Sequence, residues 1–495
     1  MTLDRLAASV PGARVTGDPE TGIRDLSYDS RKISDGALFV ALRGSDFDGH
    51  RFVASAVANG AAAVLVEEEM PVAVPQIIVP GSSRAALAQV ACTFYGDPSH
   101  ELTVIGITGT DGKTTTTAML ESILNGTGRQ AGAIGTVGVR IGDGTSYDLG
   151  HQTTPESNHV QRYLREMVTA GTTHAVIEAT SHGLVTHRLD GVRFAAGGVT
   201  NITHEHLEFH KTIENYRRAK ATLLERTGEV RGVVVINNDD VGARSVVPYA
   251  TGARVVTYGL EGEVDLRAEH IDHAGTGVSF DVVAGDDITR VELPMAGMFN
   301  VSNALCAIGL ATGCGVRLEE AARALSQATP VSGRMQPIDA GQPFRVIVDY
   351  AHTPESLRTI LSLLRAQYRD GRLIVVTGSA GERDVEKRPM QGEVCARIAD
   401  VTIVTSEDPR NEDPDAIIDE IVVGAERAGA VRGESVRAVT HRRDALRAAF
   451  EIARPGDCVL LAGKGHETSI IWGYEHVPWN EAAIAEELLR EMIGS

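Results

Sequence analysis

The sequence predicts an α/β protein of about three domains, and three observations carry this prediction. At 495 residues the chain is too long for one hydrophobic core. Its 43% hydrophobic content is ample for globular packing. Apolar strand-like runs alternate with helix-like segments, which is typical of parallel sheets. We predict a small N-terminal α/β domain (1–100), a central phosphate-loop domain with a parallel sheet (101–331) and a C-terminal doubly wound, Rossmann-like domain (332–495).

Composition excludes several classes of protein. A formal net charge of −19 argues against a nucleic-acid surface, which needs clustered Lys and Arg. No apolar run is long enough to cross a bilayer, and the N-terminus lacks the pattern of a signal peptide. The five cysteines are odd in number and show no metal-binding spacing. We therefore expect reduced thiols in a cytoplasmic protein that uses neither nucleic acid nor membrane.

In the first domain, residues 36–44 read as a strand ending in glycine. The turn at 45–50 precedes a helix over 52–59 and a strand over 62–66. The triplet Asp29-Ser30-Arg31 is weak evidence of function, because such triplets usually cap helices or form turns.

The central domain begins with a glycine-rich turn between a strand (102–107) and a helix (114–124). Gly109 and Gly112 let backbone N–H groups face a phosphate, and Lys113 adds a cation. The strict phosphate-loop pattern has glycine where Ile107 stands, so a plain strand-to-helix turn is the alternative. The Lys-Thr pair directly after Gly112 favours nucleotide binding.

A carboxylate follows in the same predicted sheet. Glu178 ends the strand 173–178, at the edge where ligands collect, so it suits Mg²⁺ together with the Thr114 hydroxyl. A capping or salt-bridged glutamate is the alternative. Further strands are predicted over 195–200 and 230–236.

Two other polar features of this domain are ambiguous. The segment His204-Glu205-His206-Leu-Glu208-Phe-His210 resembles a zinc cluster by count. The spacing of His204 and His206 would place them on different faces of a helix, which favours separate roles. Lys220 lies between alanines of a predicted helix (213–224), and the residues alone indicate a solvated lysine.

The C-terminal domain has four predicted strands, at 345–349, 373–377, 401–405 and 458–462. A polar or glycine-rich loop follows each one. Because parallel strands end at the same edge, these loops should line one crevice. The loops span 350–354, 378–384, 406–410 and 463–467.

Taken together and in order, these motifs resemble the Mur ligases of peptidoglycan synthesis, most of all the type that adds the third residue of the stem peptide. The resemblance covers nearly the whole chain. The phosphate loop has the family's form Gly-Thr-x-Gly-Lys-Thr-Thr. The other matching segments are Glu178, Ser181–Gly183, Thr200–Asn201, His206, Tyr216 to Lys220, Asn237–Asp240, Gly297–Asn303, Gly333–Met335, Asp349–Pro354, Lys387–Pro389 and Gly463–Glu467.

The resemblance implies an ATP-dependent, Mg²⁺-requiring ligase that acts as a monomer on small molecules. It would phosphorylate the D-Glu side chain of UDP-N-acetylmuramoyl-L-alanyl-D-glutamate, and a diamino acid would displace the phosphate. The implied catalytic residues are Lys113, Lys220 and His206. The implied metal ligands are Thr114, Glu178, His206 and Lys220, the last as a carbamate.

The resemblance also assigns three sets of binding residues. For ATP they are Gly109, Thr110, Asp111, Gly112, Lys113, Thr114, Thr115, Asn300, Arg334 and Asp349. For the UDP-sugar dipeptide they are Ser30, Ser45, Asp46, Phe47, Thr153, Thr154, Thr180 and Arg188. For the incoming amino acid they are Arg383, Glu407, Asp408, Arg410, Gly463 and Glu467.

Three departures from the family pattern affect these expectations. His204-Glu205-His206 replaces Arg-Asp-His, and Thr180 replaces a serine. The loop starting at Glu407 reads Glu-Asp-Pro-Arg, where diaminopimelate-adding members have Asp-Asn-Pro-Arg. Arg410 suits the distal carboxylate of meso-diaminopimelate, whereas Asp408 would favour the bare ammonium of lysine or ornithine. We predict diaminopimelate and leave lysine and ornithine as the alternative.

Other functions remain as alternatives. The nearest are folylpolyglutamate synthase and the Mur ligase that adds D-Ala-D-Ala, but the Asp-Ser-Arg triplet and the Glu-Asp-Pro-Arg loop favour the third-residue type. A non-ligating ATPase would not need an amino-acid pocket, and a UDP-sugar-binding module would leave Lys113 and Glu178 without a role.

Overall fold

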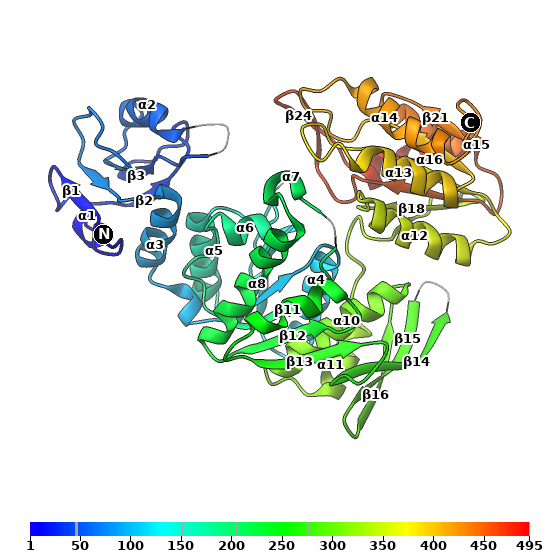
Figure 1. Ribbon diagram of the computed structural model, residues 1–495, viewed down its shortest axis with the longest axis horizontal. Helices are drawn as coiled ribbons and strands as arrows, with labels where there is room; N and C mark the ends of the chain where they lie inside the picture. The colour runs from blue at the N-terminus through cyan, green and yellow to red at the C-terminus, as the bar shows by residue number, and fades with distance from the viewer. Residues whose placement is uncertain (45–47, 151, 204, 275–276, 495) are drawn as a thin grey trace.

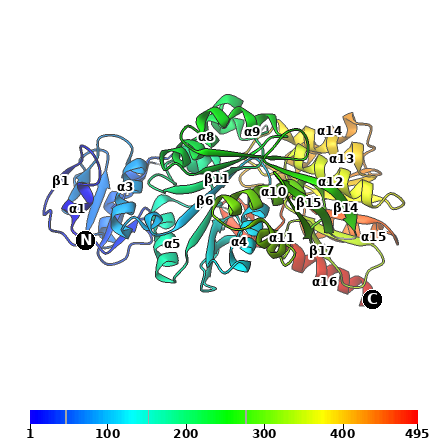
Figure 2. The same cartoon turned by 90° about the horizontal axis from the view of Figure 1, so that it is seen from below.

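The computed structural model describes residues 1–44, 48–150, 152–203, 205–274 and 277–494. Three α/β units follow one another, with the N-terminal unit in blue and the C-terminal unit in yellow to red on opposite sides of the central one (Figure 1). The view from below shows the same order (Figure 2). The predicted three-domain α/β fold is confirmed. Ser45, Asp46, Phe47 and His204 lie outside the described residues.

The N-terminal domain holds a five-stranded sheet in the order β1-β5-β4-β3-β2, in which only β1 is antiparallel to its neighbour. Its strands are β1 (Arg14–Thr16), β2 (Asp25–Ser27), β3 (Ala37–Val40), β4 (Ala63–Val66) and β5 (Gln76–Ile78). Its helices are α1 (Leu3–Ala7), α2 (Val53–Ala58) and α3 (Ser83–Tyr95). Helix α3 ends at Gly96, in the left-handed region with φ of 72°, and packs beside α5 of the central domain (Figure 1).

The central domain is built on an eleven-stranded sheet in the order β16-β15-β14-β13-β12-β11-β6-β10-β7-β8-β9. Strand β6, which carries the glycine-rich turn, lies in the middle and is parallel to both neighbours. The strands are β6 (Thr103–Thr108), β7 (Ala131–Gly135), β8 (Gly138–Arg140), β9 (Ser146–Tyr147), β10 (His174–Glu178), β11 (Phe194–Val199), β12 (Val233–Asn237), β13 (Arg254–Gly259), β14 (Leu266–Ala274), β15 (Gly277–Ala284) and β16 (Asp287–Leu293).

Helices cover both faces of this sheet, and alternation along β6 shows how. Ile105 and Ile107 pack under α4, α10 and α11, whereas Val104 packs under α5, α6 and α8. The helices are α4 (Lys113–Gly126), α5 (Ser157–Thr169), α6 (Ser181–Val185), α7 (Leu207–His210), α8 (Ile213–Glu229), α9 (Val241–Ser245), α10 (Met298–Gly313) and α11 (Leu318–Leu325). The antiparallel extension β14–β16 was not anticipated from the sequence.

The C-terminal domain has a six-stranded sheet in the order β17-β18-β22-β19-β20-β21, parallel except for β17. The four predicted loops therefore meet at one edge, as expected. The strands are β17 (Gln336–Ile338), β18 (Arg345–Asp349), β19 (Leu373–Thr377), β20 (Val401–Val404), β21 (Val436–Ala438) and β22 (Cys458–Ala462), followed by a hairpin of β23 (Ser469–Trp472) and β24 (Glu475–Pro478). The helices are α12 (Pro354–Gln367), α13 (Lys387–Ile398), α14 (Pro414–Arg427), α15 (Arg442–Ile452) and α16 (Glu481–Gly494).

The chain enters this last domain through a segment that is bound to the C-terminal sheet. Gly333 has a φ of 68°, and a Cβ there would lie 2.2 Å from the backbone nitrogen of His466. Its N–H donates to Oε1 of Gln336 at 2.7 Å, and the N–H of Met335 donates to Oδ2 of Asp349 at 2.7 Å. No helix in the described part of the chain is long and apolar enough to span a membrane.

Candidate functional site

A cavity of about 1240 Å³ lies between the central and C-terminal domains. The predicted site residues in its lining are Thr110, Asp111, Gly112, Lys113, Thr114, Thr115, Thr153, Thr154, Thr180, Arg188, His206, Asn300, Arg334, Asp349, Arg383, Glu407, Asp408, Arg410 and Glu467. Of the others that are described, Gly109, Glu178, Lys220, Gly463 and Ser30 are not part of the lining. Ser30 belongs to the N-terminal domain, where its carbonyl accepts a hydrogen bond from Asn59.

The glycine-rich turn is held by close packing and by hydrogen bonds to its own carbonyls. Gly109 and Gly112 have φ of 154° and 84°, and a Cβ on Gly112 would lie 2.3 Å from Oδ1 of Asn303. Asn303 therefore packs directly against the turn. The N-cap of α10 is Gly297. Nζ of Lys113 donates to the carbonyls of Gly109 (3.0 Å) and Thr110 (2.8 Å). A cation beside the N-terminus of α4 fits a bound phosphate.

Glu178 is a buried carboxylate whose hydrogen-bond partners are all neutral groups. It is 1% exposed, and its Oε2 accepts the hydroxyls of Thr114 (2.9 Å) and Thr136 (2.8 Å), while its Oε1 accepts the N–H of Thr136 (2.9 Å). None of the ion pairs in the described residues includes Glu178. A buried carboxylate without a cation, next to a threonine hydroxyl, suits Mg²⁺. The structure thus argues against a salt-bridged glutamate.

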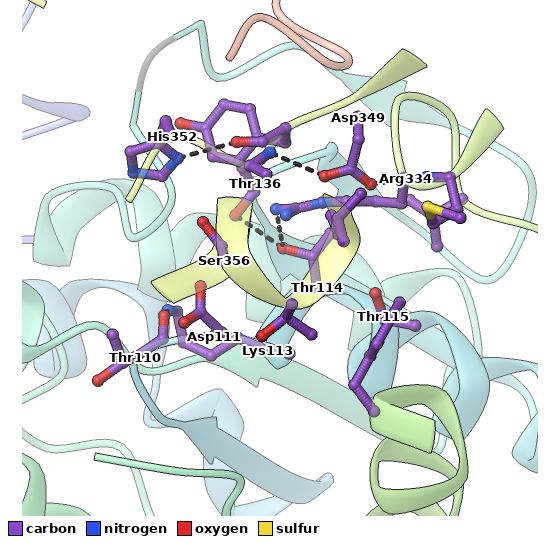
Figure 3. Close-up of a pocket in the computed structure, with 18 of the residues that line it drawn as sticks. Thr110, Asp111, Lys113, Thr114, Thr115, Thr136, Arg334, Asp349, His352 and Ser356 are labelled. Atoms are coloured by element: carbon purple, nitrogen blue, oxygen red, sulfur yellow. Dashed lines mark hydrogen bonds between the residues drawn. The ribbon is translucent and has the colours of Figure 1, made fainter. Parts of the chain in front are cut away.

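Two residues flank the Thr114 hydroxyl, as Figure 3 shows. The Thr136 hydroxyl lies 3.2 Å from it, and Nη2 of Arg334 reaches it at 3.4 Å from the C-terminal side. The guanidinium of Arg334 also stacks on Tyr350, 4.6 Å from the ring centre. Sequence reasoning missed Thr136. Its position directly after strand β7, at the edge of the sheet that binds ligands, was the available signal.

Lys220 is buried, so its interpretation as a solvated helix residue is wrong. It is 1% exposed, and its Nζ donates to the Gly109 carbonyl at 2.6 Å, above the ring of Tyr216. The same carbonyl accepts Nζ of Lys113. Burial, reinforced by the Lys113 cation, holds the pKa of Lys220 well below its usual value. A neutral amine is the form that can react with CO₂ to give a carbamate.

His206 lies in a loop rather than on a helix. It has a φ of 56° and immediately precedes α7, so the argument from helix faces does not apply. Its Nε2 lies 3.6 Å from Oε2 of Glu205 and its Nδ1 lies 3.5 Å from Oε1 of Glu208. Among the described residues, no three His, Cys, Asp or Glu side chains are grouped to hold a metal. His206 and Glu178 are therefore not joined in one preformed cluster.

Glu205 connects the central domain to the C-terminal one. Its Oε1 lies 3.6 Å from Nε2 of His352, whose Nδ1 contacts the Tyr350 carbonyl at 2.9 Å. Burial lowers the pKa of His352, but the hydrogen bond to Glu205 and the negative charges of Glu205 and Glu407 together outweigh it, and the net pKa is raised. Burial likewise raises the pKa of Glu205, but the charges of His206 and His352 prevail and hold it well below its usual value. No local sequence pattern indicates this contact between distant segments.

Hydroxyl groups line the part of the cavity nearest α6. Oγ1 of Thr154 donates to the Glu178 carbonyl at 2.7 Å and lies 2.9 Å from Oγ1 of Thr180, which caps α6. Oγ1 of Thr153 contacts Thr136 at 3.2 Å. Arg188 donates through Nη1 to the Thr154 carbonyl at 2.8 Å. Thr180 thus keeps the hydroxyl of the serine that it replaces.

The C-terminal wall of the cavity carries charges that the described residues leave unmatched. Glu407 is 7% exposed, and its buried Oε2 has no hydrogen-bond partner. Arg410 has a φ of 54° and a buried Nε without a partner. Neither Arg383 nor Arg410 forms an ion pair within the described ranges. Burial lowers the pKa of Arg383, and the nearby charge of Arg410 lowers it further.

Asp408, by contrast, has a cationic partner within the protein. Its Oδ1 accepts Nζ of Lys464 at 2.9 Å and the N–H of Ile471 at 2.9 Å. Lys464 is fully buried and also contacts Oε2 of Glu467 at 2.5 Å. Lys464 thus offsets part of the negative charge that Asp408 adds to this loop, and it is shared with Glu467. The loop predicted to bind the amino acid and the last loop of the sheet are joined by this ion pair.

Comparison with known proteins covers all three domains. Family models match at residues 22–95 ("Mur ligase family, catalytic domain"), 107–311 ("Mur ligase middle domain") and 333–465 ("Mur ligase, glutamate ligase domain"). A curated protein of Roseiflexus sp. (strain RS-1), named UDP-N-acetylmuramyl-tripeptide synthetase, is 45% identical over 95% of both chains. The chain belongs to the Mur ligase family. The resemblance inferred from its motifs is thereby confirmed, as is its class, an ATP-dependent ligase.

Two further relatives of this Mur ligase are informative. A protein of Geobacillus kaustophilus (strain HTA426) is 40% identical over 99% of this chain and 100% of its own. It is named UDP-N-acetylmuramoyl-L-alanyl-D-glutamate–2,6-diaminopimelate ligase. A solved structure of a ligase with the same name is 28% identical, covers 100% of both chains and has a TM-score of 0.65.

Proposed function

We propose that this Mur ligase joins meso-2,6-diaminopimelate to UDP-N-acetylmuramoyl-L-alanyl-D-glutamate at the expense of ATP. The observation that carries the choice of amino acid is the unmatched charge on the C-terminal wall. Arg383 and Arg410 have no ion pair in the described residues, and Glu407 has a buried oxygen without a partner. The far end of diaminopimelate bears one carboxylate and one ammonium group. Two guanidinium groups and one carboxylate complement it.

Lysine and ornithine fit this wall less well. Each has an ammonium group at its far end but no carboxylate, so the exposed Arg383 and the half-buried Arg410 would gain no anionic partner from it. The buried Nε of Arg410 would then stay without a partner, which favours the substrate that carries a distal carboxylate. The Asp-for-Asn departure at Asp408 favours these substrates less than its sequence suggests, because Lys464 pairs with Asp408 while also contacting Glu467.

In the proposed reaction, the phosphate loop holds the ATP phosphates. Lys113 and the N-terminus of α4 bind their negative charge, and Arg334 approaches from the opposite domain. The residues that would hold Mg²⁺ are Thr114, Glu178, His206 and Lys220 as its carbamate. When bound, Mg²⁺ would neutralise charge on the phosphates. Asn300 and Asp349 complete the proposed nucleotide pocket.

The chemistry proceeds in two transfers. The terminal phosphate of ATP passes to the side-chain carboxylate of D-Glu, which gives an acyl phosphate and ADP. The amine of the diamino acid then attacks the carbonyl carbon. A C–N bond forms, inorganic phosphate leaves with the C–O bond electrons, and the amine loses its proton to solvent. Both steps depend on positioning by the two domains, since the carboxylate alone is a poor electrophile.

Ligation rates with each diamino acid test this proposal. We expect ADP release only when ATP, the UDP-sugar dipeptide and the amino acid are all present, with diaminopimelate used fastest. A clear preference for lysine or ornithine would refute the proposed substrate. ADP release without the dipeptide would instead indicate a non-ligating ATPase.

Two sequence-based expectations belong with this proposal. We infer that the protein acts as a monomer and in the cytoplasm. All five cysteines are free thiols. Analytical ultracentrifugation with and without substrates checks the monomer, and a stable dimer would contradict it.

A further inference from the structure

Between the N-terminal and central domains lies a buried carboxylate that neither the phosphate loop nor the amino-acid wall uses. Glu156 precedes α5 and is 5% exposed. Nη1 of Arg84, on helix α3 of the N-terminal domain, donates to both of its oxygens at 2.7 Å. Nε of Arg188, from the central domain, lies 3.2 Å from its Oε1. One carboxylate thus joins two arginines from different domains.

The start of α5 makes further contacts across the same boundary. Nδ2 of Asn158 donates to the carbonyl of Leu26, in β2, at 3.1 Å. The ring of His159 packs 5.5 Å from that of Tyr28. Tyr28 precedes Ser30, the residue expected at the UDP end of the substrate, by two positions. The first turn of α5 therefore rests on the part of the N-terminal domain that leads to Ser30.

Of Glu156 and its two arginine partners, only Arg188 lines the cavity in the described structure. Its Nη1 donates to the Thr154 carbonyl, and its Nε lies within ion-pair distance of Glu156 but forms no hydrogen bond. Its Nη2 has no hydrogen-bond partner in the described ranges. One hydrogen bond and one ion pair thus orient this guanidinium, and its Nη2 donor is left for a carboxylate.

We propose that Glu156 is a positioning residue that aims Arg188 at the dipeptide part of the substrate and, through Arg84, ties that arginine to the N-terminal domain. The spacing between the UDP end and the dipeptide end of the pocket is then set by one buried group. This inference rests on the proposed function for the identity of the substrate. It adds Glu156 and Arg84, which touch no substrate, to the residues that determine its binding.

Calorimetric binding to the full-length enzyme, without ATP, tests the proposal with two ligands. The first is UDP-N-acetylmuramoyl-L-alanyl-D-glutamate, and the second is UDP-N-acetylmuramic acid, which lacks the dipeptide. For Glu156→Gln we expect about tenfold weaker binding of the first ligand, the equivalent of about 1.4 kcal/mol. Binding of the second ligand should change by less than about twofold, because Arg188 does not reach it.

Two other variants separate the contribution of the Arg84–Glu156 contact from a general effect of losing a paired carboxylate. Arg84→Gln removes only the link to the N-terminal domain and should weaken binding of the full substrate by about threefold. Combined with Glu156→Gln it should add nothing, since both act through one contact. Glu121→Gln is the matched control: Glu121 also pairs with an arginine, Arg140, at 2.8 Å in a partly buried site, but it does not line the cavity.

Steady-state kinetics give the second readout. Glu156→Gln should raise KM for the UDP-sugar dipeptide about tenfold and leave KM for ATP unchanged. Glu156→Asp should recover part of the loss. Unchanged binding in Glu156→Gln, equal loss for both ligands, or the same loss in Glu121→Gln would overturn the proposal. A wild-type enzyme that binds the dipeptide ligand but does not ligate would refute the proposed function and leave the binding test valid.

Discussion

The two walls of the cavity differ in how their charges are satisfied. On the central wall, the protein itself supplies the partners: Lys113 donates to loop carbonyls, and Glu178 accepts three hydrogen bonds. On the C-terminal wall, Glu407 and Arg410 each have a buried polar atom without a partner in the described structure. The polar groups of the first wall are thus hydrogen-bonded within the protein, whereas under the proposed function the charges of the amino acid would match those of the second. Variants on each wall should therefore fail in different ways.

The largest effect is expected at Lys220, on the central wall. If its carbamate holds a metal, Lys220→Ala should lower kcat by about a thousandfold, because a ligand that acts in the transition state is lost. Added short carboxylates should restore part of the rate, since they can occupy the vacated space. Rates with and without acetate or formate measure this. A fully active Lys220→Ala enzyme would contradict the proposed role.

Glu178 should have the next largest effect. Glu178→Gln keeps the shape and an acceptor oxygen for Thr114 but removes the negative charge. We expect about a hundredfold loss of kcat and a higher Mg²⁺ requirement. Titration of the rate with Mg²⁺ measures both. Thr136→Ser is the control, because it keeps the hydroxyl that contacts Glu178, and its rate should stay near that of the wild type.

Arg410, on the C-terminal wall, should change preference rather than chemistry. Arg410→Ala should weaken the use of diaminopimelate by roughly tenfold, because one partner of its distal carboxylate is lost. The rate with lysine should change little, since lysine has no distal carboxylate for Arg410 to bind. The ratio of kcat/KM for the two amino acids is the measurement. Equal losses for both would show that Arg410 acts on the fold and not on recognition.

The smallest effect concerns stability. Because folding lowers the pKa of Lys220, the folded protein must strip a proton that the unfolded chain keeps. Lys220→Met should therefore stabilise the inactive protein by about 1 kcal/mol in CO₂-free buffer. The gain should be larger at pH 6 than at pH 9, because the cost of losing the proton grows as pH falls. Thermal melts at both values measure it, and a destabilised variant would contradict the prediction.

The sequence predicted the central wall better than the C-terminal wall, and the reason is physical. A phosphate loop is encoded locally, by glycines such as Gly112 whose positive φ other residues rarely adopt. The strands of the C-terminal sheet were equally predictable from their apolar runs, and so was the edge at which their loops meet. What each side chain does at that edge was not.

The missing information lies in contacts between distant residues. Asp408 was read as a free negative charge because its partner, Lys464, is 56 positions away. Lys220 was read as solvated because its neighbours in sequence do not show that α8 packs against the glycine-rich turn. Glu205 and His352 meet only when two domains come together. Local pattern cannot supply these pairings, which decide charge and burial.

Arg334 connects the C-terminal wall of the cavity to the central wall. Gly333, Met335 and Gln336 are fastened to the C-terminal sheet, so this short segment must travel with that domain. Arg334 nevertheless touches Thr114 of the phosphate loop. A hinge between the domains would therefore lie before Gly333, and Arg334 would move together with the C-terminal domain. A change in the angle between the two domains would therefore move Arg334 relative to the phosphate loop, and a ligand bound in that loop would in turn restrict the angle.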